Sequence, residues 1–338
     1  MDAQAQSRSD AAAPALLAHD RTQWVDVARG LGIILVVWGH ALRAHFDLTG
    51  VAWAAAQDRW IYSFHMPLFF LLAGLFLWRS IGKGKSQFLK GRWSGVIWPY
   101  LLWSFVCGLI ELSLANYVTS PIGLREVLLL PFVPIEQFWF LYALLICQLI
   151  CLALFPSKAW LWLFVIIGLG LLQIVASPWI GFRALIYLPF VAVGLTFTGA
   201  LKRLAQAQPI AHFLFFLGAF SCLGAVLLTE AADSFPRLSL LLTGIFGSVS
   251  LMALSMLMAG QATLGSILGS LGRASLAIFV LHTLFSAGTR IAFKLVGVAP
   301  ENAISFGSSV LAGLTVPWLI YLWARRRRLL SPLGFGSA

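Results

Sequence analysis

Long apolar stretches, each able to cross a bilayer as a helix, recur along the whole chain and constrain its fold more than any other feature. A membrane-spanning helix needs about 20 mostly apolar residues, and backbone polar groups in hydrocarbon must bond within their own segment. We therefore predict an all-α, polytopic integral membrane protein with ten transmembrane helices. The predicted spans are residues 24–43, 59–78, 95–115, 138–155, 159–176, 183–201, 210–229, 239–259, 266–287 and 303–323.

The composition excludes a soluble enzyme. Hydrophobic residues make up 60% of the 338 residues and charged residues only 10%, and the mean hydropathy is +0.90. One core could not hide that much apolar surface from water, whereas a bilayer accepts it. The cysteines lie in apolar stretches without metal-ligand spacing, so we interpret them as small core residues and expect no metal. They are Cys107, Cys147, Cys151 and Cys222.

The distribution of lysine and arginine predicts which side of the membrane the loops face. The loop "RSIGKGKSQFLKGR" after the second span has basic residues and no acid, and the last predicted span is followed by Arg325 to Arg328. Loops rich in these residues stay in the cytoplasm, so both termini are expected there. The formal net charge of +11 then reports membrane topology and gives no reason to expect nucleic-acid binding.

This topology divides the chain into three parts. Residues 1–22 are a polar cytoplasmic tail, residues 23–324 are the transmembrane domain, and residues 325–338 are a basic cytoplasmic tail. The first apolar stretch is too long for the core of a signal peptide and lacks a convincing cleavage site, so it is expected to remain as the first span.

The first span carries charged groups that a lipid-facing helix would avoid. A charge at the centre of a bilayer costs roughly 2.5–3.5 kcal/mol on insertion scales, so such residues are functional candidates. Arg29 and His40 are eleven residues apart, which places them within about 20° of one helix face and about 16 Å apart along the axis. Asp26 lies one turn before Arg29 and can pair with it. One face therefore presents an ion pair near the cytoplasm and an imidazole deeper in the membrane.

Three further polar residues are predicted at a height similar to that of His40. His65 lies in the second span, Glu111 in the third and His282 in the ninth, and a rise of about 1.5 Å per residue puts all of them in the outer half of the membrane. Two non-functional interpretations stay open. The histidines could serve solely to join helices by hydrogen bonds, and Glu111 could serve solely to reach interfacial water. The sequence does not say whether these residues converge laterally.

Five short motifs follow one another along the chain. "RTQWVDVARG" runs into "ILVVWGH", which gives an Arg–x10–His pattern from Arg29 to His40; "FHMPLFFLLAGLFLWRS", "KGRWSGVIWPY", "QFWFLYALL" and "ASLAIFVLH" follow, the last ending at His282. In this order they resemble the membrane acyltransferase family 3 proteins, most closely the standalone O-acetylase branch that includes fucose 4-O-acetylase-like proteins. The resemblance covers spans one to four and nine.

The resemblance implies transfer of an acyl group, usually acetyl, from cytoplasmic acyl-CoA to a sugar hydroxyl in the inner membrane of a bacterium. Acetyl-CoA is the expected donor, and a saccharide or lipid-linked oligosaccharide of a surface polysaccharide or exopolysaccharide is the expected acceptor. The bilayer and polysaccharide-assembly proteins are the expected partners. This sequence departs from the family pattern in two ways. Ala73-Gly74 stands where the family often has Ser-Gly, and no SGNH-type domain is expected after the tenth span. Transfer is therefore expected within the membrane core or through a separate protein.

In that reaction His40 is the expected general base, because an imidazole has an ordinary pKa of about 6.5 and accepts a proton at neutral pH. Arg29 and Asp26 complete the catalytic set. An acyl-enzyme on His40 is a variant of this mechanism. His65 is expected to stabilise the developing oxyanion.

The family's donor also suggests where its phosphates bind. Arginine binds phosphate by bidentate, charge-assisted hydrogen bonds, and Arg29, Arg79 and Arg92 lie on the predicted cytoplasmic side with Lys90. The loop residues among them could equally be topology signals alone. The candidates for substrate binding are His65, Glu111, Glu136, Trp139 and His282.

Two other classes of function fit the buried polar residues. A transporter or flippase for a polar or lipid-linked saccharide would use them as a translocation path, although the two halves show no matching helices broken by glycine or proline. A non-catalytic sensor or assembly subunit would tolerate replacement of His40 without chemical consequence.

Overall fold

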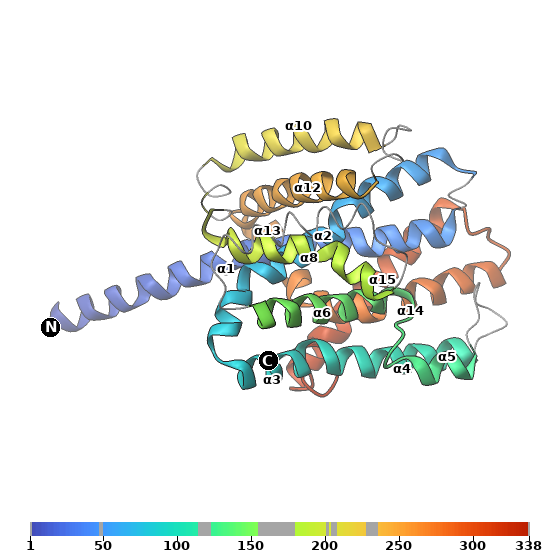
Figure 1. The fold of residues 1–338 in the computed structure, drawn as a ribbon, viewed down its shortest axis with the longest axis horizontal. Helices are drawn as coiled ribbons and strands as arrows, with labels where there is room; N and C mark the ends of the chain where they lie inside the picture. Colours follow the sequence, from blue (N-terminus) through green and yellow to red (C-terminus); the bar gives the residue numbers. More distant parts are fainter. Residues whose placement is uncertain are drawn as a thin grey trace.

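The predicted all-α fold is confirmed. The computed structural model describes residues 2–46, 50–113, 123–154, 180–200, 203, 208–227 and 236–336, in which every regular element is helical. The long helices run side by side along one direction (Figure 1). The α-helices are Asp2–His45 (α1), Ala52–Gly82 (α2), Lys85–Arg92 (α3), Trp98–Ser113 (α4), Leu124–Leu129 (α5), Trp139–Leu154 (α6), Ile180–Thr196 (α8), Pro209–Leu227 (α10), Pro236–Ala259 (α12), Ala262–Arg273 (α13), Ser275–Leu295 (α14) and Ala303–Arg326 (α15).

Eight helical segments in the described part of the chain are long and apolar enough to cross a membrane, so this is a polytopic membrane protein. They are Gln23–His45, Ala52–Gly82, Lys85–Ser113, Glu136–Leu154, Pro209–Val226, Leu238–Ala259, Ser275–Leu295 and Ala303–Arg326. The predicted sixth span coincides with α8, whose apolar part, Ala184–Thr196, is shorter. The predicted fifth span, residues 159–176, lies outside the described residues, so the count of ten stays a prediction.

Two short irregular helices interrupt these spans. The π-helical turn η1 (Trp93–Ile97) joins α3 to α4, and the 3-10 turn η2 (Glu136–Phe138) precedes α6. π-Helical turns inside α-helices are rare and often mark functional sites. Both turns contribute residues to the cavities described below.

Helix α1 lies at the centre of the bundle. It packs against α2, α12, α13, α14 and α15, and apolar residues on several of its faces, such as Val27, Val37 and Leu42, are buried. A helix that is apolar nearly all round is surrounded by protein or lipid. Three polar residues of this span are only partly exposed, namely Asp26, Arg29 and His40.

The predicted ninth span, residues 266–287, is wrong as one helix. Helix α13 ends at Arg273, and α14 starts only at Ser275. Glycines let α13 lie directly on the α1 backbone: a Cβ on Gly272 would be 1.7 Å from the Asp26 carbonyl oxygen, and one on Gly30 would be 2.1 Å from that of Leu268. Small residues permit such close approach of membrane helices. The break and the glycines together bring Arg273 beside the start of the first span.

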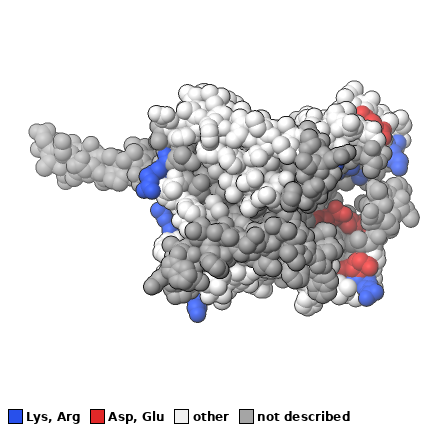
Figure 2. Space-filling view, turned by 45° about the horizontal axis from the view of Figure 1, so that its top comes forward, with Lys and Arg blue, Asp and Glu red and all other residues white. Residues whose placement is uncertain are grey.

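Both described ends of the chain lie at one end of the bundle, together with α3 (Figure 1). We call this the basic end and define it by Lys85–Arg92 and Arg325–Arg328. On the face shown in Figure 2, lysine and arginine occur at this end without described acidic residues, whereas the opposite end shows acids and bases together. The positive-inside rule accordingly predicts that the basic end faces the cytoplasm.

Part of the predicted C-terminal tail is docked on the bundle. The indole N–H groups of Trp98 and Trp103 donate hydrogen bonds to the carbonyl oxygens of Pro332 and Leu333, at 2.9 Å and 2.8 Å. The ring of Phe335 stacks on that of Trp103 with 5.6 Å between centroids. Residues 327–336 thus hold the start of α4 in place.

Candidate active site

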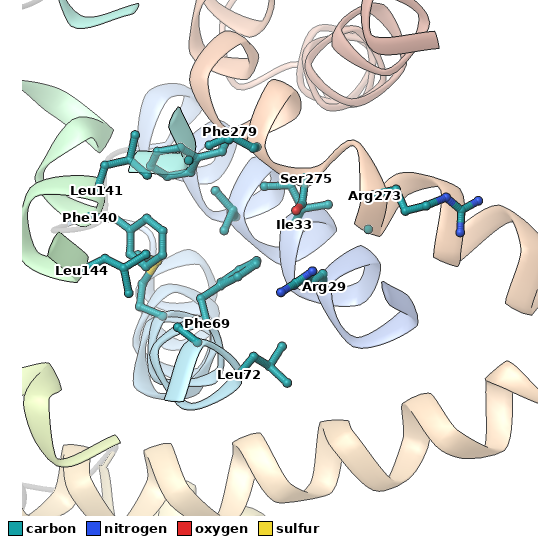
Figure 3. A pocket seen from close by; sticks show the side chains of 16 residues that line it. Arg29, Ile33, Phe69, Leu72, Phe140, Leu141, Leu144, Arg273, Ser275 and Phe279 are labelled. Carbon is teal, nitrogen blue, oxygen red and sulfur yellow. The ribbon is translucent and has the colours of Figure 1, made fainter. Parts of the chain in front are cut away.

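Two cavities lie one after the other between the helices around α1. The inner cavity, nearer the basic end, has a volume of about 250 Å³, and the outer cavity beyond it has about 580 Å³. No residue in the described part of the chain lines both. The phenyl rings of Phe140 and Phe279 both line the inner cavity, with 5.3 Å between centroids (Figure 3). Neighbouring residues line the outer cavity: Trp139 precedes Phe140, and Thr283 lies one turn after Phe279.

Two arginines form the polar part of the inner cavity. Arg29 and Arg273 both line it, and both guanidinium groups lie near the Asp26 carboxylate, at 3.8 Å and 3.6 Å. The predicted pair of Asp26 and Arg29 is therefore present, together with a second arginine that was not predicted as a site residue. One carboxylate between two guanidinium groups leaves this side of the cavity with a net positive charge. Such a site suits an anion.

A signal for Arg273 was present in the sequence. It stands nine residues before His282, in the same basic-then-histidine order as Arg29 and His40. Arg273 reaches the inner cavity because the helix breaks at Ala274, and the apolar sequence around Ala274 does not predict that break.

The remaining wall of the inner cavity is apolar. Figure 3 shows Phe69, Leu72 and Leu144 across from Arg29, with Ile33 and Leu141 towards the phenyl rings. Gly95 of the π-helical turn also lines the cavity. An elongated ligand with an anionic head and a slender body matches this combination of groups.

The other predicted phosphate-binding residues lie at the basic end but do not line the inner cavity. Arg79 and Lys90 are exposed on the surface. Arg92 is half-buried, and its guanidinium donates to the amide oxygen of Gln148 at 2.8 Å. The structure therefore groups Arg29 with Arg273, not with these three.

The three predicted membrane histidines lie close together. The ring centroids of His40 and His282 are 4.9 Å apart. The Tyr62 ring links His40 to His65, because its centroid is 6.4 Å from that of His40 and 4.5 Å from that of His65. Among the residues the structure describes, no three side chains of metal-binding type form a possible ion site. This lateral convergence did not follow from the sequence.

Hydrogen bonds distinguish these histidines. Nδ1 of His65 lies 2.6 Å from the Ile61 carbonyl oxygen, and Nδ1 of His282 lies 2.8 Å from that of Phe279. A carbonyl oxygen only accepts, so both Nδ1 atoms carry the proton and each neutral ring keeps its lone pair on Nε2. His40 has no such bond within the described residues. It is partly exposed and lines the outer cavity, so it is the histidine that a ligand can reach.

The outer cavity brings together most of the predicted substrate-binding residues. His40 lines it with Glu111, Glu136 and Trp139, whereas His65 and His282 are fully buried behind the wall. Glu136 has φ +42°, in the left-handed region. A non-glycine residue held there is uncommon, and such strain clusters at functional sites.

Several outer-cavity residues were not predicted as site residues. Arg43 lines the cavity, forms a bidentate ion pair with Asp58 at 2.7 Å and 2.9 Å, and lies 3.3 Å from the centroid of the Tyr62 ring. Thr283 accepts a hydrogen bond from Gln137 at 2.8 Å, and Arg290 adds a second cation. The sequence signals of Arg43 and Arg290 are single charges near predicted span ends, which resemble ordinary interfacial residues.

Comparison with known families decides the class of protein. A family model for acyltransferase family 3, described as an acyltransferase domain, matches residues 22–322, nearly the whole chain. The chain belongs to acyltransferase family 3. It is thus a multi-pass membrane acyltransferase, and its matched region contains both cavities.

A curated relative adds a partial match. The acyltransferase is 33% identical to nodulation protein NolL of Mesorhizobium japonicum over 129 residues. The aligned segment covers 37% of this chain and 34% of NolL. The match spans about a third of the relative's length. No solved structure matches the acyltransferase.

Proposed function

We propose that this acyltransferase moves an acetyl group from cytoplasmic acetyl-CoA to a hydroxyl of a bacterial surface polysaccharide or exopolysaccharide, or of its lipid-linked precursor, in the inner membrane. The observation that supports this most directly is the pair of cavities. One has two arginines and an apolar wall on the side of the basic end, and the other has His40 among groups that bind hydroxyls. His40 lies where a donor from one side meets an acceptor from the other.

The donor fits the inner cavity by charge and by length. Arg29 and Arg273 suit the phosphates of CoA, because guanidinium groups bind them by bidentate hydrogen bonds. The distance along α1 from Arg29 to His40 is about 16 Å at 1.5 Å per residue. A pantetheine arm is about 15–20 Å long if extended, at about 3.3 Å per residue-equivalent length. The arm would lie along the apolar wall of the inner cavity and would reach His40 by displacing the phenyl rings of Phe140 and Phe279.

The acceptor fits the outer cavity by its polar groups. Carboxylates of Glu111 and Glu136 can accept hydrogen bonds from sugar hydroxyls, and the Trp139 ring offers an apolar face for stacking. Arg43 and Arg290 on the same cavity can donate to ring or hydroxyl oxygens. A polyhydroxylated ligand uses both donors and acceptors, which this lining supplies.

The transfer step is then a direct one. His40 takes the proton of the acceptor hydroxyl as its oxygen attacks the thioester carbon. The new C–O bond forms, the C–S bond breaks, and the proton passes from His40 to the CoA thiolate. His65 is not retained as the oxyanion donor, because its one proton in the neutral form is bonded to the Ile61 carbonyl.

The first test is transfer of labelled acetyl from acetyl-CoA to polysaccharide in inverted membrane vesicles that contain the protein. We expect label on the polysaccharide, and none with vesicles that lack the protein. Binding of labelled acetyl-CoA separates this proposal from a transporter, which does not need that ligand. No transfer and no binding would contradict acetyl-CoA as the donor.

Removing either arginine of the inner cavity should weaken the use of the donor. Arg273→Ala and Arg29→Ala are each expected to raise the KM for acetyl-CoA by about 10- to 100-fold, since a hydrogen bond to a charged group contributes about 1.5–3 kcal/mol. The value of kcat should change less. Steady-state kinetics with varied acetyl-CoA measure both.

Arg59→Ala is the matched control for these variants. Arg59 is exposed and lies in α2 towards the end opposite the basic end, so its removal should leave the KM unchanged. An unchanged KM in Arg273→Ala and Arg29→Ala would mean that both arginines serve only as partners of Asp26.

A further inference from the structure

His282 is a buried titratable group that the proposed mechanism leaves unused. It is 0% exposed and does not line the outer cavity. An acceptor in that cavity therefore does not touch it, which removes the substrate-binding role predicted from the sequence. Its ring is nevertheless close to the ring of His40, at 4.9 Å between centroids.

The protonation of the His282 ring is fixed by its own helix. Nδ1 lies 2.8 Å from the Phe279 carbonyl oxygen and 3.1 Å from that of Ile278, so it carries the proton. Nε2 is buried and has no hydrogen-bond partner within the described residues. A buried acceptor without a partner costs about 1–3 kcal/mol, so its presence calls for an explanation.

The geometry supplies a partner for that lone pair. Ring nitrogens lie about 1.1 Å from an imidazole centroid, so two rings joined by a hydrogen bond of about 2.9 Å have centroids no more than about 5.1 Å apart. The two rings are within that separation and meet at an interplanar angle of 68°. The His40 side chain has no hydrogen bond in the described structure, so a rotation of its ring would be free to bring a nitrogen within bonding distance of the His282 ring.

We propose that His282 is a positioning residue for His40. Its Nε2 accepts a hydrogen bond from a His40 N–H, which leaves the other His40 nitrogen unprotonated and facing the acceptor hydroxyl in the outer cavity. When His40 takes up the proton of that hydroxyl, the same bond holds the imidazolium in place. No net proton enters or leaves His282 in this step. The inference rests on the proposed function of His40 as general base.

The structure contains a matched control for this role. His65 is also 0% exposed, also bonds its Nδ1 to a carbonyl of its own helix and also has an unpartnered Nε2. Its ring packs edge-on against Tyr62, and no ring contact with His40 is present among the described residues. The two histidines differ in the ring beside them, which is that of His40 for His282 and that of Tyr62 for His65.

The test compares three variants in the acetyl-transfer assay: His282→Leu, His282→Gln and His65→Leu. His282→Leu should lower kcat by roughly 10- to 100-fold, which is part of the 10²–10⁴-fold that general-base catalysis contributes. The KM values for donor and acceptor should stay near those of the wild type. His282→Gln keeps an oxygen that can accept the bond, and it should restore at least part of kcat. His65→Leu should lower kcat much less.

The outcomes separate this inference from the proposed function. Acetyl transfer by the wild type with equal kcat in His282→Leu and His65→Leu would overturn the role of His282 and leave the acetyltransferase proposal standing. A fall in kcat that His282→Gln does not relieve would mean that the imidazole only packs the helices. We expect the melting temperature of purified His282→Leu in detergent to stay near that of the wild type, because leucine fills most of the site and the loss of the imidazole hydrogen bonds is offset by the removal of polar atoms from the interior.

Discussion

His40→Ala is expected to lower the rate of acyl transfer by about 10²–10⁴-fold, the contribution of a positioned general base. The protein should still fold and insert, because His40 has no hydrogen bond within the described residues and its ring is partly exposed to the outer cavity. Transfer of labelled acetyl in membrane vesicles measures the rate, and the amount of protein extracted by detergent and its melting temperature measure the fold.

His212→Ala is the control for this variant. His212 lies in α10, a helix that packs against α12 and α2, and it lines neither cavity. It should transfer acetyl at the wild-type rate. Transfer by His40→Ala within a few-fold of wild type would remove His40 from the mechanism, whatever donor is used.

The polar face of the first span could be predicted because helix geometry is local. Eleven residues separate Arg29 from His40 whatever surrounds the helix, and the cost of a charge in hydrocarbon already marked the ion pair with Asp26 as unusual. The same rise per residue put Glu111 at the height of His40, and the two residues line one cavity.

The sequence did not predict which arginines lie together. Arg79, Lys90 and Arg92 carry the same charge as Arg273 and lie at the same end of the bundle, yet only Arg273 lines the inner cavity beside Arg29. The difference comes from Gly30 and Gly272, which let α13 rest on α1. Close packing between helices that are distant in sequence depends on the whole fold. It therefore cannot be predicted from composition or from the spacing of residues along one helix.

The roles of the histidines needed the structure for a related reason. His65 and His282 have the same local sequence signal, an imidazole in an apolar helix, and each bonds to its own helix in the same way. Only lateral placement sets His282 against His40 and His65 against Tyr62. Sequence spacing gives height along a helix axis, whereas lateral neighbours follow from tertiary packing.

Gly272→Ala tests whether this packing of helices builds the donor site. The added Cβ would lie 1.7 Å from the Asp26 carbonyl oxygen, a main-chain atom that cannot rotate aside, so α1 and α13 must separate. Overpacking typically costs about 1–3 kcal/mol and occasionally more, and a backbone contact belongs at the upper end. We expect a lower melting temperature in detergent, a smaller yield of folded protein and, in what remains, a raised KM for acetyl-CoA because Arg273 moves away from Asp26.

Gly218→Ala in α10 is the matched control. No atom lies within 4 Å of a Cβ built there, so the substitution meets open space and only removes the conformational freedom of glycine. It should stabilise the helix by up to about 1 kcal/mol. Opposite shifts in melting temperature for the two substitutions would support the close contact of α1 and α13. Equal stability of Gly272→Ala and the wild type would show that these helices do not meet through Gly272, and the grouping of Arg29 with Arg273 would lose its structural basis.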